Sequence, residues 1–85
     1  MTLTILYFAW LRERIGTGEE RVGIPAGVTT LDELITWLSA RSDAHAAALA
    51  DRTRLRAAID GHYAPLGTAI TGAREVSLFP PVTGG

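Results

Sequence analysis

The residues of this chain that can do chemistry lie together at its C-terminal end. The last six residues are Pro80-Pro81-Val82-Thr83-Gly84-Gly85, and they carry no charge except the terminal carboxylate. Consecutive prolines favour an extended backbone, and glycines can enter a channel that is too narrow for a Cβ atom. Six extended residues reach about 20 Å, which is far enough to carry a carboxylate into the active site of another protein.

The chemistry that suits this terminus is acyl activation. The carboxylate of Gly85 is ionised at neutral pH and is therefore a poor electrophile. Attachment of AMP would give a reactive mixed anhydride, and a sulfur nucleophile would convert the anhydride into a thiocarboxylate. We expect Gly85 to be the reacting residue and the residues before it to form a tail inside a partner's channel. The predicted tail residues are Pro80, Pro81, Val82, Thr83 and Gly84.

Composition excludes several other functions. The 85 residues hold no cysteine, so a disulfide, a thiolate zinc site and a cysteine nucleophile are excluded. The net charge of −1 argues against binding to nucleic acid. His45 and His62 lack carboxylates at metal-ligand spacing, so we expect no metal and no bound cofactor. No apolar run reaches the length that spans a membrane and no signal peptide opens the chain, so we expect a cytoplasmic protein.

The basic residues are unusual because all eight are arginines and none is lysine. A GC-rich coding sequence would explain this. Alternatively, a protein with an activated C-terminus gains from having no internal amine that could attack it. The sequence leaves both explanations open.

The elements that must position the tail follow from side-chain periodicity. Alternation predicts strands at 2–8, 19–24, 55–59 and 74–79, with a short extension at 62–64 after a turn at 60–61. The strand at 2–8 is apolar on both faces, so we expect it to be buried on both sides or nearly so. Residues 30–41 are predicted as the main helix, and 9–15 and 44–50 as short ones. The apolar face of the main helix consists of Leu31, Leu34, Ile35 and Leu38.

This order of elements predicts an α+β fold. The first and last strands are the most apolar, so we place them together at the centre of a mixed sheet, with the main helix packed across it. Periodicity alone gives only the α+β class, and the central end strands make it a β-grasp, or ubiquitin-like, arrangement. We expect a β-grasp domain at 1–79 and an extended functional tail at 80–85.

The two ends of the chain also resemble a known family. The run from Leu78 to Gly85, Leu-Phe-Pro-Pro-Val-Thr-Gly-Gly, resembles the terminal signature of molybdopterin synthase small subunits, sulfur carriers of the ubiquitin-like ThiS superfamily. The start, with Leu-Tyr-Phe-Ala at 6–9 and Leu-Arg-Glu at 11–13, is similar to the start of the same family. Tyr63 departs from the family, where an aliphatic residue is common, and Asp60-Gly61 departs from its Asn-Gln-like pair.

The resemblance implies a sulfur carrier for molybdenum cofactor biosynthesis that is not an enzyme by itself. An E1-like enzyme would adenylate Gly85 with ATP. The thiocarboxylate would then donate sulfur to cyclic pyranopterin monophosphate, in the active site of the large subunit of a heterotetrameric synthase, and molybdopterin would form. The resemblance also implies partner contacts at Phe8, Arg12, Tyr63 and Phe79.

Some alternatives stay open on the residues alone. A carrier of the same fold could serve thiamine or tRNA thiolation, and a ubiquitin-like binding module or protein modifier would need no sulfur chemistry. Phe79 is either an exposed interface anchor or a packing residue, and Arg12 is either a partner contact or a solvated helix residue. Trp10 and Trp37 are predicted to pack against the domain, not to stack on a ligand.

Overall fold

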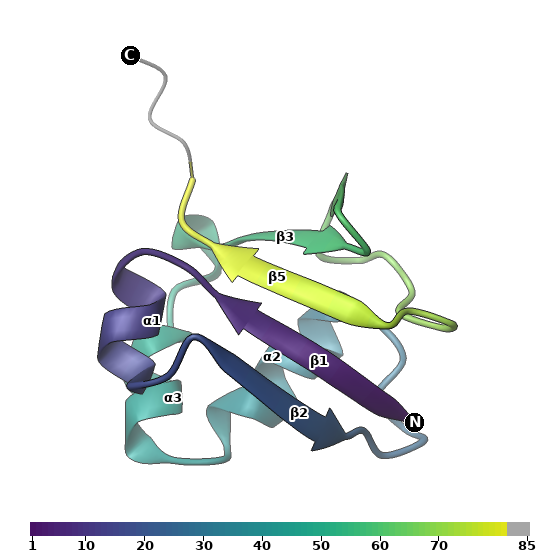
Figure 1. The fold of residues 1–85 in the computed structure, drawn as a ribbon, viewed down its shortest axis with the longest axis horizontal. Helices are drawn as coiled ribbons and strands as arrows, with labels where there is room; N and C mark the ends of the chain where they lie inside the picture. Colours follow the sequence, from purple (N-terminus) through teal and green to yellow (C-terminus); the bar gives the residue numbers. More distant parts are fainter. Residues whose placement is uncertain (82–85) are drawn as a thin grey trace.

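The first and last strands, β1 (Thr2–Tyr7) and β5 (Glu75–Phe79), lie side by side and parallel within one sheet (Figure 1). The computed structural model describes residues 1–81. Its sheet has the order β2-β1-β5-β3-β4, with β2 at Glu19–Gly23, β3 at Arg56–Ile59 and β4 at His62–Ala64. All neighbours other than β1 and β5 are antiparallel. The predicted central placement of the two end strands is confirmed.

The helices cover one face of this sheet. The main helix is α2 (Leu31–Ser39), and the shorter ones are α1 (Trp10–Ile15), α3 (Asp43–Ala48) and the 3-10 turn η1 (Arg52–Arg54). Figure 1 shows α2 and α3 behind the sheet and α1 at its edge, so the opposite face is open. The predicted α+β, β-grasp arrangement with one main helix is therefore confirmed.

Local sequence accounts for the position of α2. Thr30 caps the helix, because its hydroxyl accepts a bond from the Glu33 N–H at 3.2 Å and the Glu33 carboxylate accepts one from the Thr30 N–H at 3.2 Å. This reciprocal pair satisfies two backbone donors that have no partner inside the helix. The predicted apolar face is buried against the sheet. Its members are Leu31, Leu34, Ile35 and Leu38.

The turn between β3 and β4 also supports β5. Asp60 and Gly61 both have positive φ angles, 49° and 84°, as a two-residue hairpin turn requires. The Asp60 carboxylate accepts bonds from the backbone N–H groups of Arg74 and Glu75 at 3.0 and 2.9 Å. Asp60 thus fixes the start of the strand whose other end carries the tail.

One prediction about β1 is wrong. Leu3, Ile5 and Tyr7 are buried beneath the helices, but on the other face Thr4 and Leu6 are only half-buried. No helix of the described residues covers that face, so the strand is not buried on both sides. The apolar character of Leu6 on an open face therefore needs another explanation.

Candidate functional site

The tail leaves the domain where β5 ends at Phe79. The Phe8 N–H donates to the Leu78 carbonyl at 3.1 Å. Pro80 and Pro81, both half-buried, come directly after Phe79. Proline has no N–H to donate to a neighbouring strand, so these two residues are poor continuations of the sheet. The remaining predicted tail residues lie outside the described residues. They are Val82, Thr83, Gly84 and Gly85.

Phe79 stands at this exit as half of an aromatic pair. Its ring meets the ring of Tyr63 edge to face, with centroids 5.4 Å apart and planes at 78°. Tyr63 is 72% exposed, whereas Phe79 is half-buried and points away from the core residue Leu78. Phe79 is therefore partly a packing residue and partly exposed, because Tyr63 covers part of the ring and the rest faces solvent.

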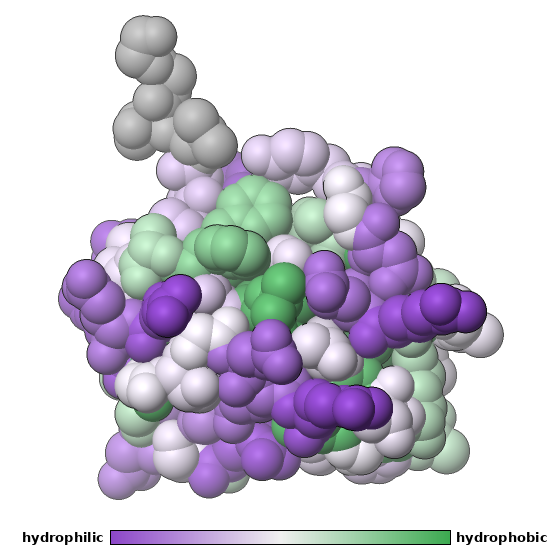
Figure 2. Space-filling model, viewed as in Figure 1, coloured by the Kyte–Doolittle hydropathy of each residue, from purple (hydrophilic) through white to green (hydrophobic). Residues whose placement is uncertain are grey.

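The aromatic pair belongs to a larger apolar area on the open face. Directly paired residues share a face, so the strand register places Ala58 beside both Tyr63 and Ser77, and Ser77 beside Leu6. We call the following set the tail-root patch: Leu6, Phe8, Ala58, Tyr63 and Phe79. Figure 2 shows apolar side chains gathered on this face at the end from which the tail leaves. An exposed apolar patch at such a place is typical of a protein–protein contact.

Phe8 and Arg12 meet at one side of this patch. Phe8 is 46% exposed, and a shallow hollow of about 410 Å³ is lined by Leu6, Phe8, Arg12 and Glu19 among others. The Arg12 guanidinium lies directly over Gly18, where a Cβ atom would come within 2.9 Å of its Cζ. Gly18 therefore gives Arg12 room to lie along the loop beside Phe8. Arg12 makes no ion pair with any residue between 1 and 81.

A second polar group lies between the sheet and α3. The Tyr7 hydroxyl donates to Glu20 Oε2 at 2.7 Å, and His45 Nε2 lies 2.8 Å from the same oxygen. Ser42 Oγ is 2.7 Å from His45 Nδ1, so both nitrogens of this buried imidazole have partners. Arg41 is 3.9 Å from the other Glu20 oxygen. His45 therefore does have a carboxylate neighbour in space, and this partner, Glu20, is 25 positions away in sequence.

Hydrogen bonds in this cluster stabilise the charged form of Glu20. Burial by itself would raise the pKa of Glu20, but hydrogen bonds with His45 and Tyr7 outweigh burial and lower that pKa below its ordinary value. Burial, together with the bond to Glu20, raises the pKa of the Tyr7 hydroxyl. The cluster thus holds a carboxylate that is ionised at neutral pH.

Residues 1–81 contain no group of three or more His, Cys, Asp or Glu side chains that could hold a metal ion. No helix in that part of the chain is long and apolar enough to span a bilayer.

Sequence reasoning missed several residues that the structure brings together. Leu6 and Ala58 join the tail-root patch, and the signal for Leu6 was the second apolar face of its strand. The Glu20–His45 contact had no sequence signal, because the two residues are 25 positions apart. The remaining predicted contact residues fall into two nearby groups. Phe79 and Tyr63 form one, and Phe8 and Arg12 form the other.

The sequence of the chain is similar to sequences of known proteins. A profile of the ThiS family matches residues 5–85. The chain is 37% identical over 83 residues to the molybdopterin synthase sulfur carrier subunit of Escherichia coli, which covers 98% of this chain and 99% of that protein. It is 34% identical over 83 residues to the protein of the same name from Haemophilus influenzae, again with 98% and 99% covered.

A solved structure of a protein with a different name is similar as well. SAMP1 of Haloferax volcanii, a small archaeal modifier protein, superposes with a TM-score of 0.72 at 30% identity, and all of both chains is covered. The match supports the β-grasp fold over the whole length. It also shows that this fold is shared by proteins with differently named roles.

Proposed function

The chain belongs to the ThiS family, and from this membership we propose that it is the sulfur carrier subunit of a molybdopterin synthase. The observation that carries the proposal is the similarity of nearly the whole chain to two subunits of that name. The fold adds support, because β5 ends at a partly exposed aromatic patch and runs directly into Pro80 and Pro81.

In this proposal Gly85 is the reacting residue. A partner enzyme of the E1 type binds ATP and transfers AMP to the Gly85 carboxylate, and a sulfur donor displaces the AMP to leave a thiocarboxylate. The thiocarboxylate then gives its sulfur to cyclic pyranopterin monophosphate in the formation of molybdopterin. The carrier holds no cofactor and contributes no catalytic side chain, so the active site for sulfur transfer lies on the large subunit.

The surface of the domain supports a docking role for the tail-root patch. We propose that Phe8, Tyr63 and Phe79 contact the large subunit, with Arg12 at the edge of the contact. Residues 80–84 then occupy a channel that ends at the large subunit's active site. Two small and two large subunits would make the complete synthase, and we place this assembly in the cytoplasm.

Mass spectrometry of the intact protein tests the chemistry. After incubation with the adenylating enzyme, ATP and a sulfur source, the mass should rise by the difference between a sulfur and an oxygen atom. Sulfur transfer to the pterin substrate is then measured with the large subunit. Deletion of Gly85 shortens the reach by about 3.5 Å, and reacting groups must approach within roughly 3–3.5 Å.

We therefore expect the Gly85 deletion to abolish sulfur transfer while the domain stays folded. A Thr4→Ala variant serves as the control, because Thr4 lies on the open face away from the tail and should leave transfer unchanged. Normal sulfur transfer by the shortened protein would contradict the mechanism.

The similarity to SAMP1 favours a second candidate, a protein modifier that is attached through its C-terminus. The two functions differ in the product of the activated terminus. A modifier forms an amide with an amine of another protein, whereas a sulfur carrier returns to the free acid after its sulfur is transferred. Recovery of covalent conjugates from cells that express a tagged form would favour the modifier.

A further inference from the structure

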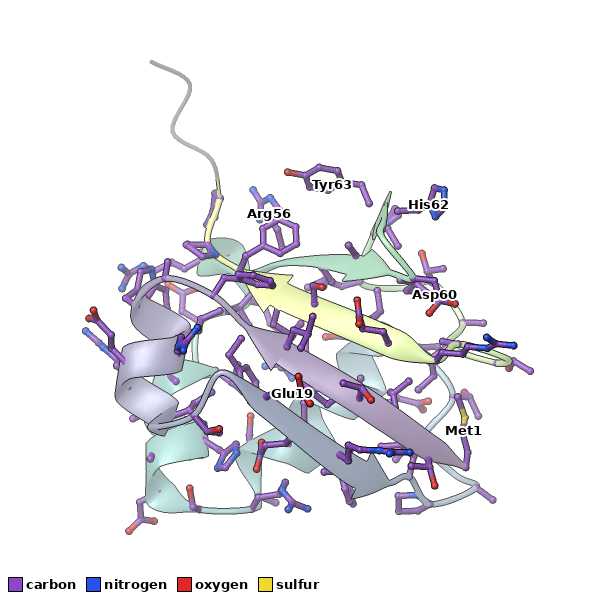
Figure 3. The ribbon with its side chains drawn as sticks, in the orientation of Figure 1. Met1, Glu19, Arg56, Asp60, His62 and Tyr63 are labelled. Atoms are coloured by element: carbon purple, nitrogen blue, oxygen red, sulfur yellow. The ribbon has the colours of Figure 1, made fainter. Side chains whose placement is uncertain are left out.

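Tyr63 is a large aromatic residue that adds little to the core of its own domain. Its side chain is 72% exposed and lies on β4, the short strand at one edge of the sheet. Figure 3 shows Tyr63 reaching from the hairpin toward the end of the sheet that carries the tail, whereas His62, its neighbour on the same strand, points away from that end. Aromatic residues on a surface are enriched where another protein binds.

The ring of Tyr63 reaches Phe79 over a strand that carries only a small side chain between them. β3 separates β4 from β5, so the strands that carry the two rings are about 9.5 Å apart. Ala58 on β3 is paired with Tyr63 on one side and with Ser77 on the other, and it lies on the same face as both. The two rings meet with centroids 5.4 Å apart. They can lean toward each other because the methyl group of Ala58 leaves the space above β3 free.

Tyr63 contacts the Phe79 ring on a side that the core does not reach. The direct cross-strand partner of Phe79 is Arg56. The Arg56 guanidinium group is engaged elsewhere, because it donates to the Leu55 carbonyl at 2.8 Å and to the Thr53 carbonyl at 3.4 Å. The contact with Tyr63 is edge to face, with the ring planes at 78°, which is a favoured arrangement of two aromatic rings. Tyr63 therefore restricts the directions in which the Phe79 ring can turn.

A ring that is held in place before docking binds more tightly than a ring that is free to turn. A side chain that samples several rotamers loses this freedom when a partner covers it, and the loss weakens binding. A contact that already restricts the side chain in the free protein removes part of this loss. The free energy of an aromatic pair is large enough to favour one rotamer over its alternatives. The contact between the two rings can therefore strengthen binding through Phe79.

We propose that Tyr63 is a positioning residue, which holds the Phe79 ring in the orientation in which it contacts the large subunit. The inference rests on the proposed function, because it takes the large subunit as the partner. Phe79 directly precedes Pro80, so a partner that receives the tail lies over this ring. The two rings then dock as one unit, and Ala58 is the small residue over which the unit is built.

The first measurement uses the free protein, so it depends on no partner. Proton chemical shifts of the Phe79 ring, measured by NMR, report the ring current of Tyr63. We expect Tyr63→Leu to move these shifts toward those of an unpaired phenylalanine, and Tyr63→Phe, which keeps a ring, to leave them close to the wild-type values. Ala58→Val should move them too, because its branched side chain fills the space in which the rings meet. His62→Leu is the matched control on the same strand and should change nothing.

The second measurement is the affinity for the large subunit, by titration calorimetry. We expect Tyr63→Leu and Ala58→Val to raise Kd about five-fold, an effect of the size that an aromatic pair carries. Tyr63→Phe and His62→Leu should bind like the wild type. Thermal melting checks the fold, and Ala58→Val should be at least as stable as the wild type because valine is favoured in strands. A residue that only supported the fold would not lower affinity while stability is kept.

The Phe79→Ala background separates positioning from direct contact. If Tyr63 acts through Phe79, Tyr63→Leu should have little further effect once that ring is absent. An equal five-fold loss in both backgrounds would overturn the proposal, because Tyr63 would then contact the partner by itself.

Two other results would also overturn the positioning role. One is unchanged Phe79 shifts in free Tyr63→Leu. The other is normal binding by Tyr63→Leu while Phe79→Ala binds weakly, and in that case the docking role of Phe79 would still stand. Failure of the wild-type protein to bind the large subunit is a different outcome, which would contradict the proposed function itself and the positioning role with it.

Discussion

Phe79 is the residue at which the sheet becomes the tail. It pairs with Arg56 across the sheet and its ring rests on Tyr63, yet part of the ring faces solvent. A partner that received the tail would meet this ring first. Aromatic anchors of this kind supply much of the binding free energy of an interface, because their burial removes a large apolar area from water.

We predict that Phe79→Ala weakens association with the large subunit by about 2 kcal/mol, or roughly thirty-fold in Kd. Titration calorimetry measures the change, and circular dichroism confirms that the domain is folded. Thr4→Ala, on the same face but outside the tail-root patch, is the control and should bind normally. Unchanged binding by Phe79→Ala would show that the ring serves only to pack against Tyr63.

The sequence indicated the direction of the Phe79 side chain but not its degree of exposure. Alternation with Val76 and Leu78 predicts that Phe79 points away from the core, as it does. Its half-burial depends on Tyr63, which reaches it from β4 across β3. A contact between strands that are not neighbours depends on the whole sheet order, and no local pattern encodes it.

At the scale of elements, α2 holds the sheet together by covering its inner face. Leu34 is fully buried there, so Leu34→Ala removes apolar contacts and leaves a cavity. We predict a loss of about 2–5 kcal/mol in the free energy of unfolding, measured by urea denaturation. Thr36→Ala, on the exposed side of the same helix, should cost less than about 1 kcal/mol. Similar values for both variants would mean that α2 does not pack through the predicted face.

The contact between β2 and α3 should make stability depend on pH. The folded state lowers the pKa of Glu20 from its ordinary value of 4.5, so Glu20 contributes stability above that value. The contribution is lost as the pH falls through the lowered folded-state pKa, because the carboxylate must then be protonated. We predict that the wild-type protein loses more stability between neutral and acid pH than Glu20→Gln does.

Urea denaturation of both proteins at a series of pH values gives the two curves. Other carboxylates with lowered pKa, such as Glu33 and Asp51, affect both proteins alike, so the difference isolates Glu20. Parallel curves would contradict a stabilising role for ionised Glu20.

These two elements also show why sequence reasoning succeeded in one place and failed in another. The apolar face of α2 is encoded within one stretch of chain, so the spacing of four apolar residues was sufficient to predict the helix. The Glu20–His45 contact forms only when α3 packs against the edge of the sheet near β2. Since its partners come from distant segments, the pattern around either residue predicts nothing.

At the scale of the whole molecule, the helices occupy one face of the sheet and leave the other free (Figure 1). The core is therefore built from the inner face, while the open face can vary without unfolding the domain. The division into a domain at 1–79 and a functional tail at 80–85 stays a prediction for the last residues. In the described residues β5 ends at Phe79, and Pro80 and Pro81 follow it.

The parallel pairing of β1 and β5 has a mechanical consequence. Force applied between Met1 and the tail would pull two adjacent parallel strands lengthwise past each other, so that their hydrogen bonds share the load simultaneously. A pull that peeled β5 from one end would break the same bonds one at a time. We expect single-molecule stretching through the termini to need a distinctly higher force than stretching from the tail to an attachment point in α1. A carrier that is held at its N-terminal end could then stay folded while a partner pulls on its tail.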